Sequence, residues 1–228
     1  MAYTFLKRTL DVFLSGIALI GISPILLLTT VILKLTGDGD IFFGQERLGR
    51  NKKPFVLFKF VTMQRGSEIV SSVTSPDDPR VLPVGRILRK AKINELPQLI
   101  NVFVGDMSIV GFRPLVEESF DLYDEGTKAC LLQMKPGLAG IGSIVFRDEE
   151  ELLRRSPKEK MRFYEDDIIP LKGALELWYF KNRSFVLDLK IIVATTFAII
   201  ASKSTFYIGW FDLNEVLENS TLGREILD

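Results

Sequence analysis

The sequence lacks histidine and has a single cysteine, Cys130, among its 228 residues. Without histidine, the commonest general base and a frequent metal ligand are missing, so acid–base or metal chemistry must depend on carboxylates. One cysteine excludes an internal disulfide and is typical of a reducing cytoplasm. We interpret Cys130 as a core residue and not as a nucleophile.

The chain also lacks a surplus of either charge. It has 29 lysines and arginines against 29 aspartates and glutamates, which gives a formal net charge of zero. Duplex binding usually needs a basic surplus, so the zero net charge argues against nucleic acid as the main partner. With 25% charged and 47% hydrophobic residues, the body is predicted to fold as one domain, or one domain plus a membrane element.

The longest stretch without charge covers residues 12–33, which is 22 positions. As a straight helix it would be about 33 Å long, enough to cross the hydrocarbon core. Lys7 and Arg8 precede it and Lys34 follows it. No Ala-x-Ala-like cleavage site follows, and the stretch is longer than a normal signal-peptide core, so a signal peptide is disfavoured. Length alone favours a spanning helix.

Ser23-Pro24 interrupts this apolar stretch. Proline lacks the N–H that would pair with the carbonyl of Ile20, so we expect the helix to kink there. The hydroxyl of Ser23 is able to supply a replacement hydrogen bond. Cations on both flanks favour both ends remaining cytoplasmic. We therefore divide the chain into a membrane helix, residues 1–36, and a cytoplasmic part, residues 37–228.

The rest of the chain predicts a mostly helical α+β fold. Two aromatic and β-branched segments, 41–43 and 54–60, predict a small β-hairpin. Residues 71–83 read as loop. The remaining predicted elements are helices over 84–92, 93–104, 115–134 and 148–169, a short strand over 143–146, and an interfacial amphipathic helix over 185–201.

Aromatic residues gather in two places. We expect Phe43, Phe58 and Phe60 to lie in the core. The run Trp178, Tyr179 and Phe180 is typical of the belt of aromatic side chains at a membrane interface.

Residues 89–114 combine cations, two carboxylates and a proline-limited helix, the composition of a phosphate-handling site. The candidate phosphate ligands are Arg80, Arg86, Arg89, Arg113 and Lys59. For at least two of the cations between 86 and 92, contact with anionic lipid is the competing interpretation. Glu95 is the candidate metal ligand or proton carrier, whereas Asp106 reads as a turn residue.

Taken in order, these segments resemble the bacterial sugar transferases, the monotopic phosphoglycosyl transferases. The matching pieces are Lys7-Arg8, Asp11, Ser23-Pro24, and the runs at 43–49, 59–63, 78–81, 85–90, 94–99, 105–108, 113–114, 135–137 and 179–190. The resemblance covers nearly the whole chain.

The resemblance implies a bacterial enzyme at the cytoplasmic face of the inner membrane. Such an enzyme moves a sugar 1-phosphate from a UDP-sugar to polyprenol phosphate and releases UMP, which opens the assembly of surface polysaccharides, lipopolysaccharides or glycoconjugates. It also implies Mg²⁺, a covalent phosphosugar intermediate on an aspartate, a homo-oligomer in some members, and a re-entrant membrane helix broken at Ser23-Pro24. We prefer this re-entrant path to a spanning one.

Four positions depart from the pattern of the family. Asn94 stands where the nucleophilic aspartate of the Asp-Glu dyad is expected, and Glu95 completes the pair. Val61, Phe112 and Glu176 replace a usual arginine, proline and aspartate. Several departures together indicate a natural divergent subgroup.

A carboxamide is uncharged and attacks phosphorus poorly, so Asn94 leaves three hypotheses open. Polyprenol phosphate attacks the UDP-sugar directly while Glu95 holds Mg²⁺, or Glu95 is itself the nucleophile. Alternatively, the chain is a pseudoenzyme that binds nucleotide sugar and serves as a scaffold or regulator. Between the two enzymatic mechanisms we favour direct attack.

Overall fold

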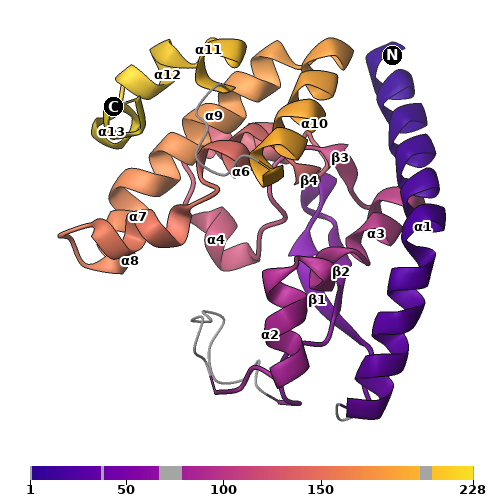
Figure 1. The fold of residues 1–228 in the computed structure, drawn as a ribbon. Coiled ribbons are helices and arrows are strands. Elements are labelled where there is room, and N and C mark those ends of the chain that lie inside the picture. Colours follow the sequence, from indigo (N-terminus) through magenta and orange to yellow (C-terminus); the bar gives the residue numbers. More distant parts are fainter. Residues whose placement is uncertain (1, 37–38, 67–78, 201–206, 228) are drawn as a thin grey trace. The chain divides into compact units, whose positions relative to one another are not determined.

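The computed structural model describes residues 2–36, 39–66, 79–200 and 207–227. It confirms a mostly helical α+β fold with a small hairpin (Figure 1). The chain forms two compact units. Unit 1 contains residues 1–8, 47–55 and 106–228, and unit 2 contains residues 9–46 and 56–105. The predicted division at residue 36 concerns the membrane and stays a prediction.

The first helix, α1, runs from Ala2 to Thr36 as one continuous element. Within the described ranges it is the one helix long and apolar enough to cross a membrane. Pro24 lies inside it, and the Ser23 hydroxyl donates a 2.7 Å hydrogen bond to the carbonyl of Ile20. This is the carbonyl that Pro24 leaves without an amide partner. The expected hydrogen bond is confirmed, but the structure shows one helix where the sequence predicted two halves separated by a break.

Unit 2 contains most of the predicted hairpin, β1 (Phe42–Leu48) paired with β2 (Pro54–Phe60), whose tip belongs to unit 1. Leu33 of α1, Phe60 of β2 and Leu88 of α2 (Pro83–Lys90) form its buried core. The predicted core position of Phe60 is confirmed, whereas Phe43 and Phe58 are half-buried.

The helix α3 (Gln98–Val104) is attached to β2 by one buried side chain. The Asn101 carboxamide accepts from the Phe58 amide at 3.0 Å and donates to the Val56 carbonyl at 2.7 Å. These bonds satisfy the edge of the strand and hold α3 against the hairpin. The predicted helix over 93–104 therefore begins five residues late, with Pro97 directly before its first residue.

Unit 1 is built on two short parallel strands, β3 (Ser108–Val110) and β4 (Gly137–Ala139), in which Ser108 pairs with Gly137. The surrounding helices supply a large apolar core. They are α4 (Glu117–Asp121), α5 (Glu125–Leu131), α6 (Ile141–Val145), α7 (Glu149–Arg155), α8 (Lys160–Phe163), a π-helical turn (Tyr164–Ile168), α9 (Ile169–Asn182), α10 (Phe185–Ile200), α11 (Tyr207–Phe211), α12 (Asn214–Glu218) and α13 (Thr221–Leu227).

Three predicted elements of unit 1 are wrong in kind or extent. The expected helix over 115–134 is two helices, because Asp124 caps α5 by accepting from the Thr127 amide at 3.0 Å. The expected strand over 143–146 is mostly helix α6. The expected helix over 148–169 is split into α7, α8 and the π-helical turn, with Pro157 between the first two.

Candidate active site

In unit 2, the helix α2 is held against the segment that follows β2. The Thr62 carbonyl accepts from the Leu82 amide at 3.0 Å, and the Thr62 hydroxyl accepts from Nε of Arg89 at 2.9 Å. A Cβ atom on Gly85 would lie 2.2 Å from the Thr62 carbonyl oxygen, so only glycine permits this approach. The packing fixes one edge of the Arg89 guanidinium.

Four of the other predicted cations also belong to this region. Met63 and Val81 form an antiparallel bridge, and the Gln64 amide donates to the Arg80 carbonyl, which places Arg80 beside the segment that follows β2. Lys59 and Arg80 are half-buried, whereas Arg86 and Lys90 are exposed. Unit 2 therefore contains the predicted ligands Lys59, Arg80, Arg86 and Arg89.

Asn94 and Glu95 lie in a single 3₁₀ turn, Ile93–Glu95, between α2 and α3. Lys92 has a left-handed backbone, φ 58°, which ends α2 and turns the chain into this element. Both side chains are half-buried. The Oδ1 atom of Asn94 is buried and has no hydrogen-bond partner among the residues that the structure describes.

This turn has the donor chemistry for Mg²⁺, which prefers oxygen ligands and is often bound by one or two side chains together with substrate phosphates. A buried amide oxygen without a partner costs about 1–3 kcal/mol, and a hard cation would satisfy it. Nowhere in the described ranges do three or more carboxylate or thiol groups form a metal cluster. The residues fit an ion shared with substrate better than an ion held by the protein alone.

Arg113 belongs to unit 1 and follows β3. Its backbone is fixed by the neighbouring residue, Phe112. The Phe112 carbonyl accepts from the Gly137 amide at 2.7 Å, and Phe112 forms a parallel β-bridge with Pro136. Phe112, one of the departures from the pattern of the family, is buried in the core. The Arg113 side chain is exposed and has no hydrogen bond or ion pair to any described residue. It is therefore an available cation on a rigid turn.

A buried polar cluster in unit 1 was not predicted. Lys172 on α9 donates to Glu149 at 2.8 Å, and its ammonium lies 5.3 Å from the ring centres of Phe146 and Tyr164. Glu176, one turn later on α9, is buried and its Oε2 has no partner in the described part of the chain. Burial raises the pKa of Glu176 to about 8, although Lys172 opposes this. In the sequence, the one local sign of this cluster is that Lys172 and Glu176 stand four residues apart in an otherwise apolar segment.

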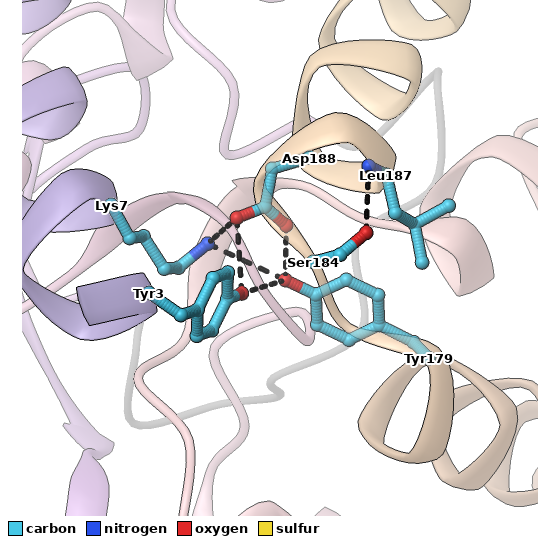
Figure 2. Close-up of polar contacts among 6 residues, drawn as sticks. All are labelled: Tyr3, Lys7, Tyr179, Ser184, Leu187 and Asp188. Carbon is cyan, nitrogen blue, oxygen red and sulfur yellow. Dashed lines mark hydrogen bonds and ion pairs between the residues drawn. The ribbon is translucent and has the colours of Figure 1, made fainter. Parts of the chain in front are cut away.

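A second unpredicted cluster joins the start of α1 to α9 and α10 within unit 1 (Figure 2). The carboxylate of Asp188, fully buried at the start of α10, accepts from Lys7 at 2.9 Å, Tyr3 at 3.0 Å and Tyr179 at 2.6 Å. Burial, followed by the negative charge of Asp188, raises the pKa of Tyr179. The expected place of Tyr179 in a membrane-interface belt is therefore wrong, because its hydroxyl bonds inside the protein.

These features lie in a chain that matches the family model described as bacterial sugar transferase over residues 2–202. The chain belongs to the bacterial sugar transferase family. The match covers α1 to α10, and therefore most of both units. The helices α11 to α13 lie beyond it.

Curated relatives support this assignment. The sugar transferase is 34% identical to the exopolysaccharide production protein ExoY of Sinorhizobium fredii (strain NBRC 101917 / NGR234) over 216 residues, with 88% of each chain covered. It is 36% identical to the uncharacterized sugar transferase EpsL of Bacillus subtilis (strain 168), covering 87% and 89% of the two chains.

A third relative carries a more specific name. The sugar transferase is 33% identical to the UDP-glucose:undecaprenyl-phosphate glucose-1-phosphate transferase of Escherichia coli (strain K12), over 88% of this chain and 41% of the relative. The chain thus corresponds to less than half of that longer protein.

Proposed function

We propose that this sugar transferase moves a sugar 1-phosphate from a UDP-sugar to polyprenol phosphate at the cytoplasmic face of the bacterial inner membrane. The observation that carries the proposal is the turn that holds Asn94 and Glu95 next to a basic segment. It occurs in a member of the sugar transferase family whose first helix is long and apolar. The name of the Escherichia coli relative supports the same class of substrates.

The chemistry requires cations because both substrates are anionic. Arg80, Arg86, Arg89 and Lys59 would reduce the repulsion between a phosphate nucleophile and a diphosphate, and Arg113 is proposed as a further phosphate ligand. Bound Mg²⁺ would supply further positive charge on the diphosphate, with Glu95 and the buried Oδ1 of Asn94 as its protein ligands.

Packing at both ends of α1 supports a re-entrant path. Near its start, Tyr3 and Lys7 bond to Asp188. Near its end, Leu33 packs against Phe60 and Leu88. These partners all follow α1 in the sequence, and no other described helix is long and apolar enough to carry the chain back across a membrane. Both ends of α1 would therefore lie on one side of the bilayer.

The helix α10 offers a second contact with lipid. Its side chains Val186, Leu189, Val193 and Phe197 are exposed and follow one another at intervals of three or four residues. Such a stripe lies on one face of a helix and suits the headgroup boundary. This is the predicted interfacial helix.

We favour direct transfer because Asn94 cannot carry the covalent step. An oxygen of polyprenol phosphate would attack the sugar-bearing phosphorus of the UDP-sugar and break its bond to the bridging oxygen, which leaves with UMP. The attacking phosphate is already an oxyanion, so no general base is needed. Nucleophilic attack by Glu95 would require a shifted substrate, since adjacent residues of a 3₁₀ turn point about 120° apart.

The second candidate function is a pseudoenzyme that binds nucleotide sugar as a scaffold or regulator. Asn94 and Val61 favour it, because they replace the expected nucleophile and a cation. UMP release by the full chain in nanodiscs, with a panel of UDP-sugars and a short polyprenol phosphate, separates the two functions. We expect turnover; nucleotide binding without turnover across the panel would establish the pseudoenzyme.

Variants distinguish the two enzymatic mechanisms in the same assay. Under direct transfer, Glu95→Gln lowers turnover by at least about a hundredfold by removing the charged metal ligand. Asn94→Ala removes only a neutral ligand, so it lowers turnover less and retains measurable activity. Asp106→Asn, an exposed turn carboxylate, is the matched control and should leave turnover unchanged. A phosphosugar adduct on Glu95 would refute direct transfer.

A further inference from the structure

Two further cations of unit 1 lie close to Arg113. Arg47 donates from Nη1 to the carbonyl of Pro114, the residue after Arg113, at 3.2 Å. Lys172 lies over the ring of Tyr164, which is itself within electrostatic range of Arg113. Arg47 therefore contacts the Arg113 turn directly, and Lys172 interacts electrostatically with Arg113.

Bringing like charges together is unfavourable, and the protein itself compensates only part of the cost. Burial, followed by the charge of Arg113, lowers the pKa of Arg47. Burial lowers the pKa of Lys172 as well; Glu149 opposes this effect and Arg113 adds to it. Both side chains would regain stability from an anion placed beside Arg113.

The ammonium of Lys172 is held in position but keeps donors to spare. Its side chain is 13% exposed, and Glu149 is the hydrogen-bond acceptor that the described residues offer it. An ammonium carries three N–H groups, so two are left for another acceptor. The rings of Phe146 and Tyr164 flank it and restrict its motion.

Glu176 lies behind this ammonium on the same helix. It fits there because a Cβ atom at residue 142 would lie 2.7 Å from its Oε1, and Gly142 has none. Burial, followed by Glu176, raises the pKa of the Tyr123 phenol in the same core. Glu176 is close enough to interact electrostatically with Lys172, but among the described residues the ion-pair partner of Lys172 is Glu149.

We propose that Lys172 and Arg113 together bind one phosphate group, with Arg47 positioning the Arg113 turn. Lys172 would donate its two remaining N–H groups to phosphate oxygens, and Arg113 would donate its planar fork. The proposal rests on the proposed function and adds Lys172 to its ligands. The phosphate could come from the nucleotide sugar in solution or from the polyprenol phosphate in the membrane.

The test measures binding to the full chain in nanodiscs, by calorimetry with UDP and inorganic pyrophosphate, and separately by retention of a short polyprenol phosphate. Lys172→Met should weaken one of these two classes of ligand by about tenfold to a hundredfold, as expected for a lost charge-assisted hydrogen bond. Lys172→Arg should recover most of the affinity. Lys181→Met, an exposed lysine on the same helix, is the matched control and should have no effect.

A second variant separates ligand binding from structural support. Glu149→Gln breaks the same ion pair but keeps the ammonium, so it should leave phosphate affinity unchanged or higher. If both variants weaken binding equally, or if Lys172→Met weakens neither ligand, the proposal is overturned. Wild-type protein that binds neither ligand would instead contradict the proposed function itself. Weakened UDP binding identifies the nucleotide as the source, and weakened lipid binding identifies polyprenol phosphate.

Discussion

At the scale of single residues, the interior of unit 1 holds a carboxyl group, Glu176, that burial keeps protonated. Its pKa of about 8 lies well above the ordinary value of 4.5. The folded state therefore holds a proton that the unfolded chain releases above about pH 4.5. Stability from this group is complete below that pH and is lost as the pH rises through about 8, by about 1.4 kcal/mol per unit.

Glu176→Gln should remove this pH dependence. The amide has nearly the same shape and no charge to desolvate, so the variant should be as stable as wild type near pH 5 and more stable near pH 8. Thermal unfolding across this range measures the difference. Equal pH slopes for the two proteins would show that Glu176 is ionised in the folded state.

The Asp188 cluster is the opposite case, a buried carboxylate with three donors (Figure 2). Asp188→Ala would leave Lys7 without its counter-ion and two hydroxyls without an acceptor. We expect a loss of about 3–5 kcal/mol in the free energy of unfolding, measured by urea denaturation in detergent. The control Glu215→Ala, on an exposed position of α12, should change it little. A small effect at residue 188 would mean that the cluster is solvated.

At the scale of elements, local chemistry explains what the sequence could predict. Aromatic and β-branched runs on either side of a polar turn predicted the β1–β2 hairpin, and the apolar run predicted α1. The segment 143–146 was misread because β-branched residues favour strands, whereas its buried packing in unit 1 stabilises the helix α6. The spacing of Lys172 and Glu176 was the one local sign of the Lys172 cluster, whereas its ion pair joins residues 23 positions apart and no local pattern reveals it.

The last three helices, α11 to α13, extend beyond the family match yet belong to the core of unit 1. They bury Ile208, Phe211, Leu213, Leu217 and Leu222, each worth about 1.5–3 kcal/mol. Ending the chain at residue 206 should therefore remove a large part of the stability of unit 1. Limited proteolysis should cleave the truncated protein rapidly in α9, against which α12 packs. Protection equal to that of the full chain would show that these helices are dispensable.

At the scale of the whole molecule, the family, the apolar helix and the basic segment agree on a membrane-associated sugar transferase. The catalytic candidates could be predicted from the sequence because they lie in short motifs, such as the turn that carries Asn94 and Glu95. The mechanism could not be predicted from the sequence. The amide of Asn94 replaces the expected carboxylate nucleophile, and this one change decides whether a covalent intermediate can form at that residue.

The most direct test of the account follows one turnover of the full chain in nanodiscs with UDP-sugar and polyprenol phosphate. Mass spectrometry would follow both the intact protein and the lipid. We predict equal amounts of UMP and polyprenol diphosphate sugar, and a protein whose mass never increases by a phosphosugar. A chain that binds UDP but forms neither product would contradict the account.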